Sequence, residues 1–424
     1  MSDTDSPFWG QVRDALGIEP EDRLRLSGGA SRETWSFTAG GRPLIVQARR
    51  SSKGVSGHPP AVEAALLAAA AEAGVPVPGL VAQGDTWFVV ERVEGETIAR
   101  KLLRDEAFAA ARAVLPEQCG RALAAIHSIP VDAISGLDDH DQLDLYATLI
   151  AGLDHPRPAL ALGLRRLQAT RPPSERRALV HGDFRTGNLL VGPDGLRAVL
   201  DWELAHVGDP IEDLGWFCSR AWRFGSPHRA GGFGPVEDLL RGYGTPVDPA
   251  ALQWWEAFAA LRWAVICLFQ ASTHLSGASR SVELAAIGRR ATESEWDLLC
   301  ALAATPDSQP PDFGEPPKSS FVHPTAKELV EAVREHLAEV TATTEGRPSF
   351  QARVARNALG IVERELELGP AITAAHQARL EKLGLEDDAA LVAAIQAGRD
   401  DLGPSVATMV RDQMLVANPR YLNT

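Results

Sequence analysis

Hydrophobic and polar residues alternate in several short stretches of the first ninety residues, and this period of two predicts β-strands. Trp35 and Phe37 show the alternation clearly, and strands are expected at 35–37, 44–50, 80–81 and 87–90. Between them, a run rich in alanine and leucine predicts a helix from Ala61 to Ala73, which Gly74 ends. The first part of the chain is therefore predicted to be a small sheet with one helix.

From Thr97 onward the pattern is mainly helical, with one exception. Two apolar runs, 189–191 and 198–200, flank the turn signal Gly192-Pro193-Asp194-Gly195 and predict a β-hairpin. A proline-rich stretch then reads as a semi-rigid linker. Helices are expected beyond it at 325–340, 350–368, 371–383, 388–397 and 404–418.

A chain of 424 residues is too long for one ordinary hydrophobic core, so several domains are expected. The change from alternating to helical pattern places the first boundary near residue 94, and the linker sets the others. We predict a β-rich lobe at 1–94, an α-rich lobe at 95–303, the linker at 304–320 and an all-α bundle at 321–424.

Polar side chains lie at the ends of the short strands around the predicted hairpin. His181 and Asp183 follow one apolar run, Asn188 precedes the next, and Asp201 follows the last. Oxygen-bearing side chains at the ends of neighbouring strands can converge on one point, and Mg²⁺ prefers such ligands and usually brings substrate phosphates with it. A polar hairpin with capping residues is the plainer alternative.

The spacing of these residues favours catalysis over capping. His-x-Asp-x-x-x-x-Asn is the catalytic-loop pattern of kinases, in which the Asp orients or deprotonates the attacking hydroxyl and the Asn holds a metal ion. A second metal-binding Asp belongs after a hairpin, and Asp201 has that position. We therefore predict Asp183 as the catalytic base, with Asn188 and Asp201 as the metal ligands.

The segments His181-Gly182-Asp183 with Asn188, and Asp201-Trp202-Glu203, resemble those of the aminoglycoside phosphotransferase-like small-molecule kinases, which include choline kinase-type enzymes. The likeness is strongest to the kinase-like domains fused to, or encoded near, acyl-CoA dehydrogenases, and it covers about residues 20–305. It implies an α+β, bilobal protein-kinase-like fold followed by an all-α bundle. It also implies an ATP-dependent enzyme with Mg²⁺ that phosphorylates a hydroxyl of a small molecule.

The resemblance assigns further residues to the nucleotide. The small-residue turn Gly28, Gly29, Ala30 and Ser31 has the place of the loop that covers the phosphates. The strand that carries a Lys in kinases carries none here, so Arg49 is the predicted substitute, held by Glu63 of the following helix, and Gln47 is the alternative. Glu91 and Val93 fall in the expected hinge, whose backbone would bind the adenine.

Three residues are predicted to support the catalytic loop. His181 belongs to the loop itself, Asp209 is expected to cap the following helix with Pro210 at its first position, and Asp213 is expected to bind the loop backbone.

The acceptor pocket is predicted from a segment in which aromatic residues and arginines interleave, because that composition suits an apolar molecule with anionic groups. The candidates are Trp202, Glu203, Arg220, Trp222 and Arg223. A hydroxyacyl-CoA or related metabolite is one such acceptor. The alternatives are an aminoglycoside or another antibiotic, and a nucleotide-binding regulator without catalysis, which only the missing strand Lys favours.

Composition limits the partners. The net charge of −14 argues against sequence-independent nucleic-acid binding. The apolar helix around Trp263–Phe269 is interrupted by Arg262 and Gln270, so no membrane span is expected. Scattered cysteines and a polar N-terminus indicate a reducing compartment, and a cytoplasmic location is expected. The C-terminal bundle is a candidate for contacts within the chain or with other molecules.

Overall fold

The computed structural model describes residues 8–26, 32–49, 57–173, 176–314 and 323–423. Contacts divide the chain into two compact units. The N-terminal unit comprises residues 1–141 and 172–256, and the C-terminal unit comprises residues 142–171 and 257–424. The four domain boundaries expected from the sequence stay a prediction.

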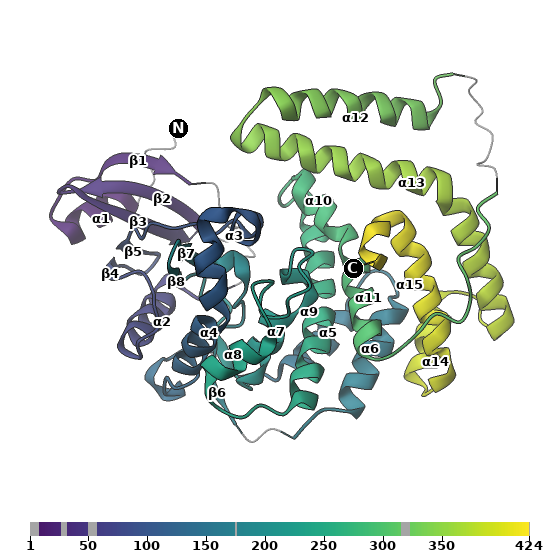
Figure 1. The fold of residues 1–424 in the computed structure, drawn as a ribbon, viewed down its shortest axis with the longest axis horizontal. Helices are drawn as coiled ribbons and strands as arrows, with labels where there is room; N and C mark the ends of the chain where they lie inside the picture. The colour runs from purple at the N-terminus through teal and green to yellow at the C-terminus, as the bar shows by residue number, and fades with distance from the viewer. Residues whose placement is uncertain (1–7, 27–31, 50–56, 174–175, 315–322, 424) are drawn as a thin grey trace. The chain divides into compact units, whose positions relative to one another are not determined.

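The N-terminal unit begins with a five-stranded antiparallel sheet in the order β1-β2-β3-β5-β4 (Figure 1). One face packs on α1 through Trp9, Trp35 and Phe37, and the other face joins a core that includes Leu66 of α2. The elements are α1 (Phe8–Leu16), β1 (Glu21–Arg25), β2 (Arg32–Ala39), β3 (Arg42–Arg49), α2 (Pro60–Glu72), β4 (Leu80–Gln83) and β5 (Trp87–Glu91).

The remainder of the N-terminal unit combines helices with two short strand pairs, β6 with β9 and β7 with β8. The same apolar core extends from the sheet side through these helices. The elements are α3 (Ala99–Arg104), α4 (Ala109–Ile126), β6 (Ala178–Val180), β7 (Leu189–Gly192), β8 (Gly195–Val199), β9 (His206–Gly208), α7 (Ile211–Cys218), α8 (Val236–Tyr243) and the start of α9 (Pro249–Leu275).

Helices α4 and α8 pack closely because each carries a glycine at the contact. A Cβ on Gly120 would lie 2.6 Å from the backbone nitrogen of Tyr243 and closer still to the carbonyl oxygen of Leu239. A Cβ on Gly242 would meet the backbone of Glu117 in the same way. Backbone atoms cannot rotate aside as a side chain can, so the two helices would have to move apart.

We therefore expect Gly120→Ala to lower the free energy of unfolding by about 1–3 kcal/mol, the usual effect of overpacking. Gly10→Ala in α1 is the matched control, since nothing lies within 4 Å of an added Cβ there. That control should stabilise by up to ~1 kcal/mol, because alanine favours helices. Denaturant unfolding of the three proteins measures both values, and equal stability of the two variants would contradict the close contact.

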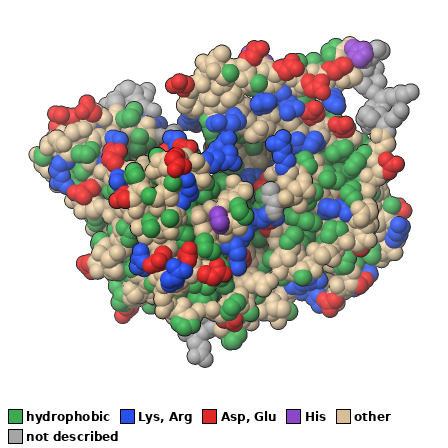
Figure 2. All heavy atoms as spheres, viewed as in Figure 1, with side chains coloured by type: hydrophobic (Ala, Val, Ile, Leu, Met, Phe, Trp, Pro, Cys, Tyr) green, Lys and Arg blue, Asp and Glu red, His purple; other side chains and the backbone are tan. Residues whose placement is uncertain are grey.

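The C-terminal unit is helical and has its own core, which includes Leu162, Leu402 and Val410. Its elements are α5 (Gln142–Ala151), α6 (Pro158–Ala169), the greater part of α9, α10 (Val282–Arg289), α11 (Ala291–Ala301), α12 (Ala326–Thr343), α13 (Gly346–Leu383), α14 (Asp388–Gln396) and α15 (Gly403–Ala417). Acidic and basic side chains are interspersed over α12 and α13 (Figure 2), and Arg334–Glu363 is one ion pair between these helices.

Helix α13 corrects one prediction. The sequence pattern predicts separate helices at 350–368 and 371–383, but the structure has one helix of 38 residues with Pro370 inside it. Proline removes one backbone hydrogen bond and clashes with the preceding turn, which bends a helix without ending it when neighbours hold both halves. The bend is visible in Figure 1.

Helix α9 is long and apolar enough to cross a membrane, judged by length and composition alone. Core helices of folded proteins satisfy the same criterion. Within the C-terminal unit, Phe258 and Leu261 of α9 are buried, and Arg262 donates a hydrogen bond from Nε to the hydroxyl of Tyr146 at 3.2 Å. These contacts agree with the core helix expected from the sequence.

Candidate active site

The loop between β6 and β7 carries the candidate base, and the β7–β8 hairpin carries the candidate metal ligands. Leu189 of β7 pairs with Val199 of β8, and the backbone N–H of Leu200 donates to the carbonyl of Asn188 at 2.9 Å. This register places Asn188 and Asp201 beside each other at one end of the hairpin. The convergence expected from the sequence therefore follows from strand pairing.

The carboxylate of Asp183 is held by donors on both oxygens. Asn188 donates from Nδ2 to Oδ2 at 2.6 Å, and Trp216 of α7 donates from Nε1 to Oδ1 at 2.9 Å. Arg185 donates from Nε to Oδ1 at 3.0 Å and to Oδ2 at 3.1 Å. These bonds fix the orientation of the carboxylate before any substrate arrives, which is what a positioned general base requires.

Asn188 uses only the nitrogen of its side-chain amide in these contacts. Nδ2 donates both to the Asp183 carboxylate and to the Asp183 backbone carbonyl, the latter at 3.0 Å. Among the described residues, Oδ1 has no donor. An amide oxygen beside an aspartate is a suitable ligand for a hard cation.

Asp201 is in an unusual environment. Its φ is +66°, a conformation that residues other than glycine rarely adopt and that is often found at functional sites. Displacement of water by surrounding protein, and then the negative charges of Glu203 and Asp183, raise its pKa to about 7, although the residue as a whole remains exposed. A crowd of carboxylates of this kind favours a bound cation, so the donor set fits Mg²⁺.

A buried network supports the catalytic loop from behind. The backbone N–H groups of His181 and Gly182 donate to Asp213 at 2.8 and 3.0 Å, the contact expected from the sequence. His181 accepts at Nδ1 from the N–H of Asp183. Burial alone would raise the pKa of Asp213, but hydrogen bonding and positive charge from His127, and the bonds from His181, hold that pKa below its ordinary value.

The position of Asp209 explains where α7 begins. Its Oδ1 accepts from the N–H of Ile211 at 2.9 Å, so it satisfies a backbone group at the first turn. Pro210 stands immediately before the helix, one residue earlier than the predicted first helical position. Because α7 carries both Trp216 and Asp213, the capped helix start sets two contacts of the catalytic loop.

The predicted ion pair between Arg49 and Glu63 is wrong. Glu63 of α2 forms its ion pair with Arg32, at the start of β2. Arg32 lies opposite Arg49 in the β2–β3 register, but Arg32 is 7% exposed whereas Arg49 is exposed at the end of its strand. The strand predicted at 35–37 does not reach Arg32, whereas β2 begins at Arg32, so the alternating pattern gives no sign of this inward-facing arginine.

Arg32 has the features of a phosphate-binding residue. It donates from Nη2 to the carbonyl of His58 at 2.7 Å, and its buried Nε and Nη1 have no acceptor among the described residues. Burial lowers its pKa, while the charges of Glu203 and Asp201 act in the opposite direction. A buried guanidinium with unused donors near Asp201 is suited to an incoming anion.

Gln47, the alternative to Arg49, faces the same region as Glu63. Gln47, Glu63 and Asp201 together line a cavity of about 30 Å³. Gln47 therefore lies beside Glu63 and Asp201, whereas Arg49 does not line this cavity. A nucleotide-binding role for Arg49 stays a prediction.

The other nucleotide residues are placed only in part. Gly28, Gly29, Ala30 and Ser31 lie outside the described residues. Glu91 ends β5, and the backbone of Val93 has no hydrogen-bond partner among the residues that the structure describes. Neighbouring Glu96 pairs with Val191 of β7 through two backbone bonds. The hinge segment is therefore hydrogen-bonded to the catalytic hairpin, and the backbone groups of Val93 can still bind a ligand.

Arg185 is the site residue that the sequence analysis missed. Its guanidinium lies 4.8 Å from the centre of the Trp222 ring, and Trp222 packs against Trp216 at 5.1 Å. Nε binds Asp183, whereas the terminal nitrogens have no acceptor among the described residues. The sequence did contain a signal for this residue: an arginine lies two residues after the predicted base, and tryptophans follow later in the chain.

The predicted acceptor residues have different positions. Trp222 is buried beneath Arg185. Trp202 is also buried and packs on His181 at 4.7 Å, so it is a core residue that an acceptor cannot reach. Arg223 donates to the carbonyl of Cys218 and pairs with Glu256, which is a structural role. Glu203 and Arg220 are partly exposed.

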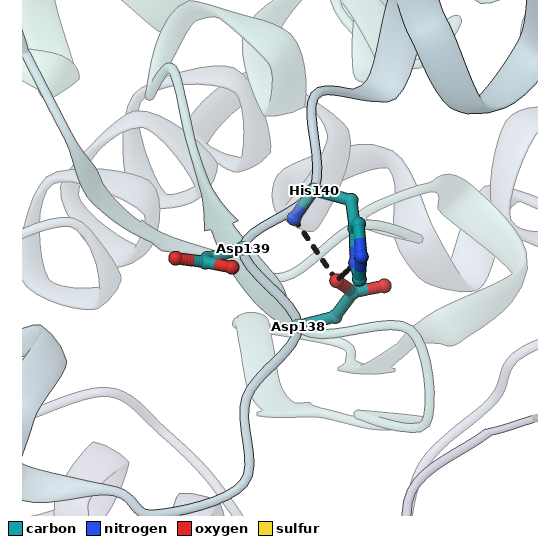
Figure 3. A group of neighbouring side chains, drawn as sticks. All are labelled: Asp138, Asp139 and His140. Carbon is teal, nitrogen blue, oxygen red and sulfur yellow. Dashed lines mark hydrogen bonds and ion pairs between the residues drawn. The ribbon is translucent and has the colours of Figure 1, made fainter.

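Asp138, Asp139 and His140 form an exposed group outside this site (Figure 3). Asp138 accepts from the backbone N–H of His140 at 3.0 Å and contacts its ring, and Asp139 pairs with Arg177 at 3.3 Å. The Asp138 backbone carbonyl accepts from Val207 of β9. These contacts stabilise the loop and leave the carboxylates engaged.

We expect Trp216→Phe to reduce turnover without affecting nucleotide affinity. The change removes the hydrogen bond to Asp183 Oδ1, and a hydrogen bond to a charged group contributes about 1.5–3 kcal/mol, so turnover should fall roughly 10- to 100-fold. Trp9→Phe in α1 is the matched control, because the Trp9 indole N–H has no acceptor among the described residues. Steady-state kinetics at varied ATP measures turnover and the KM for ATP of both variants. Wild-type turnover in Trp216→Phe as well as in the control would contradict the role of Trp216 in orienting Asp183.

The fold and site together define a kinase-like phosphotransferase with a small antiparallel lobe. Residues 22–261, more than half of the chain, match the phosphotransferase enzyme family APH. The chain therefore belongs to this family. Residues 342–421 match a second family, described as a domain of unknown function, DUF6285.

Individual proteins resemble parts of the chain. Mouse acyl-CoA dehydrogenase family member 10 is 28% identical over 217 residues, which are 47% of this chain and 20% of that protein. Mouse acyl-CoA dehydrogenase family member 11 is 30% identical over 149 residues, 31% of this chain and 18% of that protein. The chain thus spans about a fifth of the length of these curated relatives.

A solved structure shares the fold. A crystal structure provisionally described as an aminoglycoside phosphotransferase, from Ralstonia eutropha, has a TM-score of 0.54 and 22% identity over 70% of this chain and 97% of that chain. The predicted family, the predicted bilobal α+β fold with a helical C-terminal region, and the predicted enzyme class are confirmed.

Proposed function

We propose that the chain transfers the terminal phosphoryl group of ATP to a hydroxyl of a small molecule. The observation that best supports this proposal is the orientation of the Asp183 carboxylate at the Asp201 end of the hairpin. This carboxylate is held by hydrogen bonds from Asn188, Trp216 and Arg185. In the reaction, the bond from the terminal phosphorus to the bridging oxygen of ADP breaks, and a bond from phosphorus to the acceptor oxygen forms. The hydroxyl proton passes to Asp183.

The residues that would hold Mg²⁺ are Asn188, through its amide oxygen, and Asp201. Support comes from the unbonded Oδ1 of Asn188 and from the raised pKa of Asp201, since a cation would relieve the crowding of negative charge. The ion would neutralise the negative charge of the nucleotide phosphates. The protein side chains supply the orientation of base and acceptor.

We assign Arg32 and the hinge to the binding of the nucleotide. Arg32 would bind phosphate oxygens with the two nitrogens that have no acceptor among the described residues. Glu63 would keep the guanidinium in place, as a kinase Glu does for the strand Lys. The adenine would bind the free backbone groups of Val93, and the loop 28–31 would cover the phosphates.

The acceptor is proposed to carry an anionic group near an apolar body. Arg185 presents unused terminal nitrogens two residues from the base, above the apolar ring of Trp222. Guanidinium groups bind carboxylates and phosphates with two parallel bonds. A hydroxyacyl-CoA or a related hydroxy acid satisfies this description, and a polycationic aminoglycoside does not. A small molecule is the proposed partner, with neither nucleic acid nor membrane involved.

The test is release of ADP from ATP and Mg²⁺ in the presence of hydroxyacyl-CoAs, free hydroxy acids, choline and aminoglycosides. We expect activity with an anionic acceptor, none with Asp183→Asn, and a raised KM for that acceptor but not for ATP in Arg185→Lys. Activity with aminoglycosides alone would overturn the acceptor class and keep the enzyme class. ATP binding without turnover on any acceptor would count against the proposed reaction and favour a regulator.

A further inference from the structure

A pocket of about 640 Å³ lies within the C-terminal unit, and none of its lining residues belongs to the candidate active site. Pockets that bind small molecules have volumes of roughly 300–1,000 Å³, mostly apolar walls and a few convergent polar groups. This pocket meets each of these conditions. It does not depend on the proposed phosphotransfer, so the two hypotheses can fail separately.

One face of α13 forms a wall of the pocket. The lining residues of this helix recur at helical spacing and are Glu365, Gly369, Ile372, Thr373, His376 and Arg379. Pro370, which removes one backbone hydrogen bond of the helix, falls in the middle of this face. At the same point Gly369 contributes no side chain, and the nearest atom to an added Cβ would be Cγ of Glu365 at 3.7 Å. The glycine therefore leaves space at this point.

The opposing walls are mainly apolar. Helices α9 and α10 contribute Leu275 and small residues such as Ala285, and α15 contributes Met409 and Val416. Methionine adapts its shape to an irregular apolar guest. The body of a ligand that fits this space is therefore apolar.

The polar part of the pocket includes a carboxylate that two arginines share. Asp412 of α15 is 1% exposed, and it accepts from two arginines, Arg379 at 3.1 Å and Arg411 at 2.5 Å. One buried carboxylate thus faces two guanidinium groups. Of these arginines, Arg379 lines the pocket.

Arg379 keeps unused donors. Its Nη2 binds Asp412 and its Nη1 lies 3.5 Å from Nδ1 of His376, while Nε has no acceptor in the part of the chain that the structure describes. On another wall, Arg157 binds Glu295 through Nε and Nη2, and its Nη1 has no acceptor among the described residues. Guanidinium donors that remain unpaired in a mostly apolar pocket favour an acceptor-only anion.

We propose that this pocket binds a small carboxylic acid with an apolar body, whose carboxylate pairs with Arg379. Arg157 lies in the region that matches the phosphotransferase family, and the α13 and α15 walls lie in the region that matches DUF6285. The C-terminal helices thus complete a binding site to which Arg157 of the phosphotransferase region also contributes.

The experiment is isothermal titration calorimetry of the full chain with octanoate, and with 1-octanol and octylammonium as probes with the same body and a neutral or cationic head. Gly369→Leu places a side chain in the pocket at a point where an added Cβ meets only Cγ of Glu365, and leucine favours the helix more than glycine does. Gly10→Leu is the matched control, because Gly10 belongs to α1 and does not line the pocket.

We expect saturable 1:1 binding of octanoate that Gly10→Leu retains and Gly369→Leu weakens at least tenfold, with weaker binding of the other two probes. Arg379→Gln should bring the affinity for octanoate down to that for octanol. If Gly369→Leu leaves the affinity for octanoate unchanged, or if octanoate does not bind at all, the proposal that this pocket is a binding site is overturned. Equal or tighter binding of octanol or octylammonium overturns the carboxylate class.

Discussion

Asp183→Asn should reduce turnover by roughly 10³-fold, within the ~10²–10⁴ contribution of a general base. The amide of Asn cannot take the hydroxyl proton, yet its oxygen can still accept from Trp216 or Arg185, so the loop should keep its shape. ADP release with the best acceptor, together with calorimetric ATP binding, separates these effects. We expect lost turnover with ATP affinity within about threefold of wild type.

Asp194→Asn provides the matched control for this change. Asp194 lies in the turn of the same hairpin, is exposed, and pairs only weakly with Arg197 at 3.3 Å. Exposed pairs of this kind contribute about 0–1 kcal/mol. Turnover should therefore remain close to wild type in the control. Retention of more than a tenth of wild-type turnover by Asp183→Asn would remove this residue from the role of base.

The catalytic loop could be predicted from sequence because its geometry is local. Asp183, Asn188 and Asp201 are fixed by one loop and one hairpin, and the turn at 192–195 sets the register between them. Spacing along the chain then carries nearly all the information about spacing in space. The contact of Asp213 with the loop was instead predicted from the family resemblance, and the structure contains it.

The cationic residue of the nucleotide site could not be predicted in the same way. Arg32 and Arg49 are neighbours across two strands, and the choice between them depends on the twist of the sheet end and on where α2 carries Glu63. The pocket of the C-terminal unit is harder still, because helices far apart in sequence build it around a bend. Trp202 illustrates a different error: it was predicted to contact the acceptor because it follows Asp201 in the family motif, but it is buried in the core.

Arg32→Gln should raise the KM for ATP and lower kcat/KM by about 10- to 100-fold. Its buried nitrogens are proposed to make charge-assisted hydrogen bonds to phosphate, each of which contributes about 1.5–3 kcal/mol. The same substitution at Arg49 should change kcat/KM less than threefold, because Arg49 is exposed at the strand end. Steady-state kinetics at varied ATP compares the two variants directly.

Stability must be separated from binding in this comparison, because Arg32→Gln leaves Glu63 buried without its partner. Loss of one member of a buried pair costs about 3–5 kcal/mol, whereas replacement of both members is far milder. The double variant Arg32→Gln with Glu63→Gln should therefore recover thermal stability but not ATP affinity, and Arg32→Lys should recover part of the affinity. If Arg49→Gln instead caused the larger loss, the phosphates would bind the β3 arginine, and the inward position of Arg32 would serve only the fold.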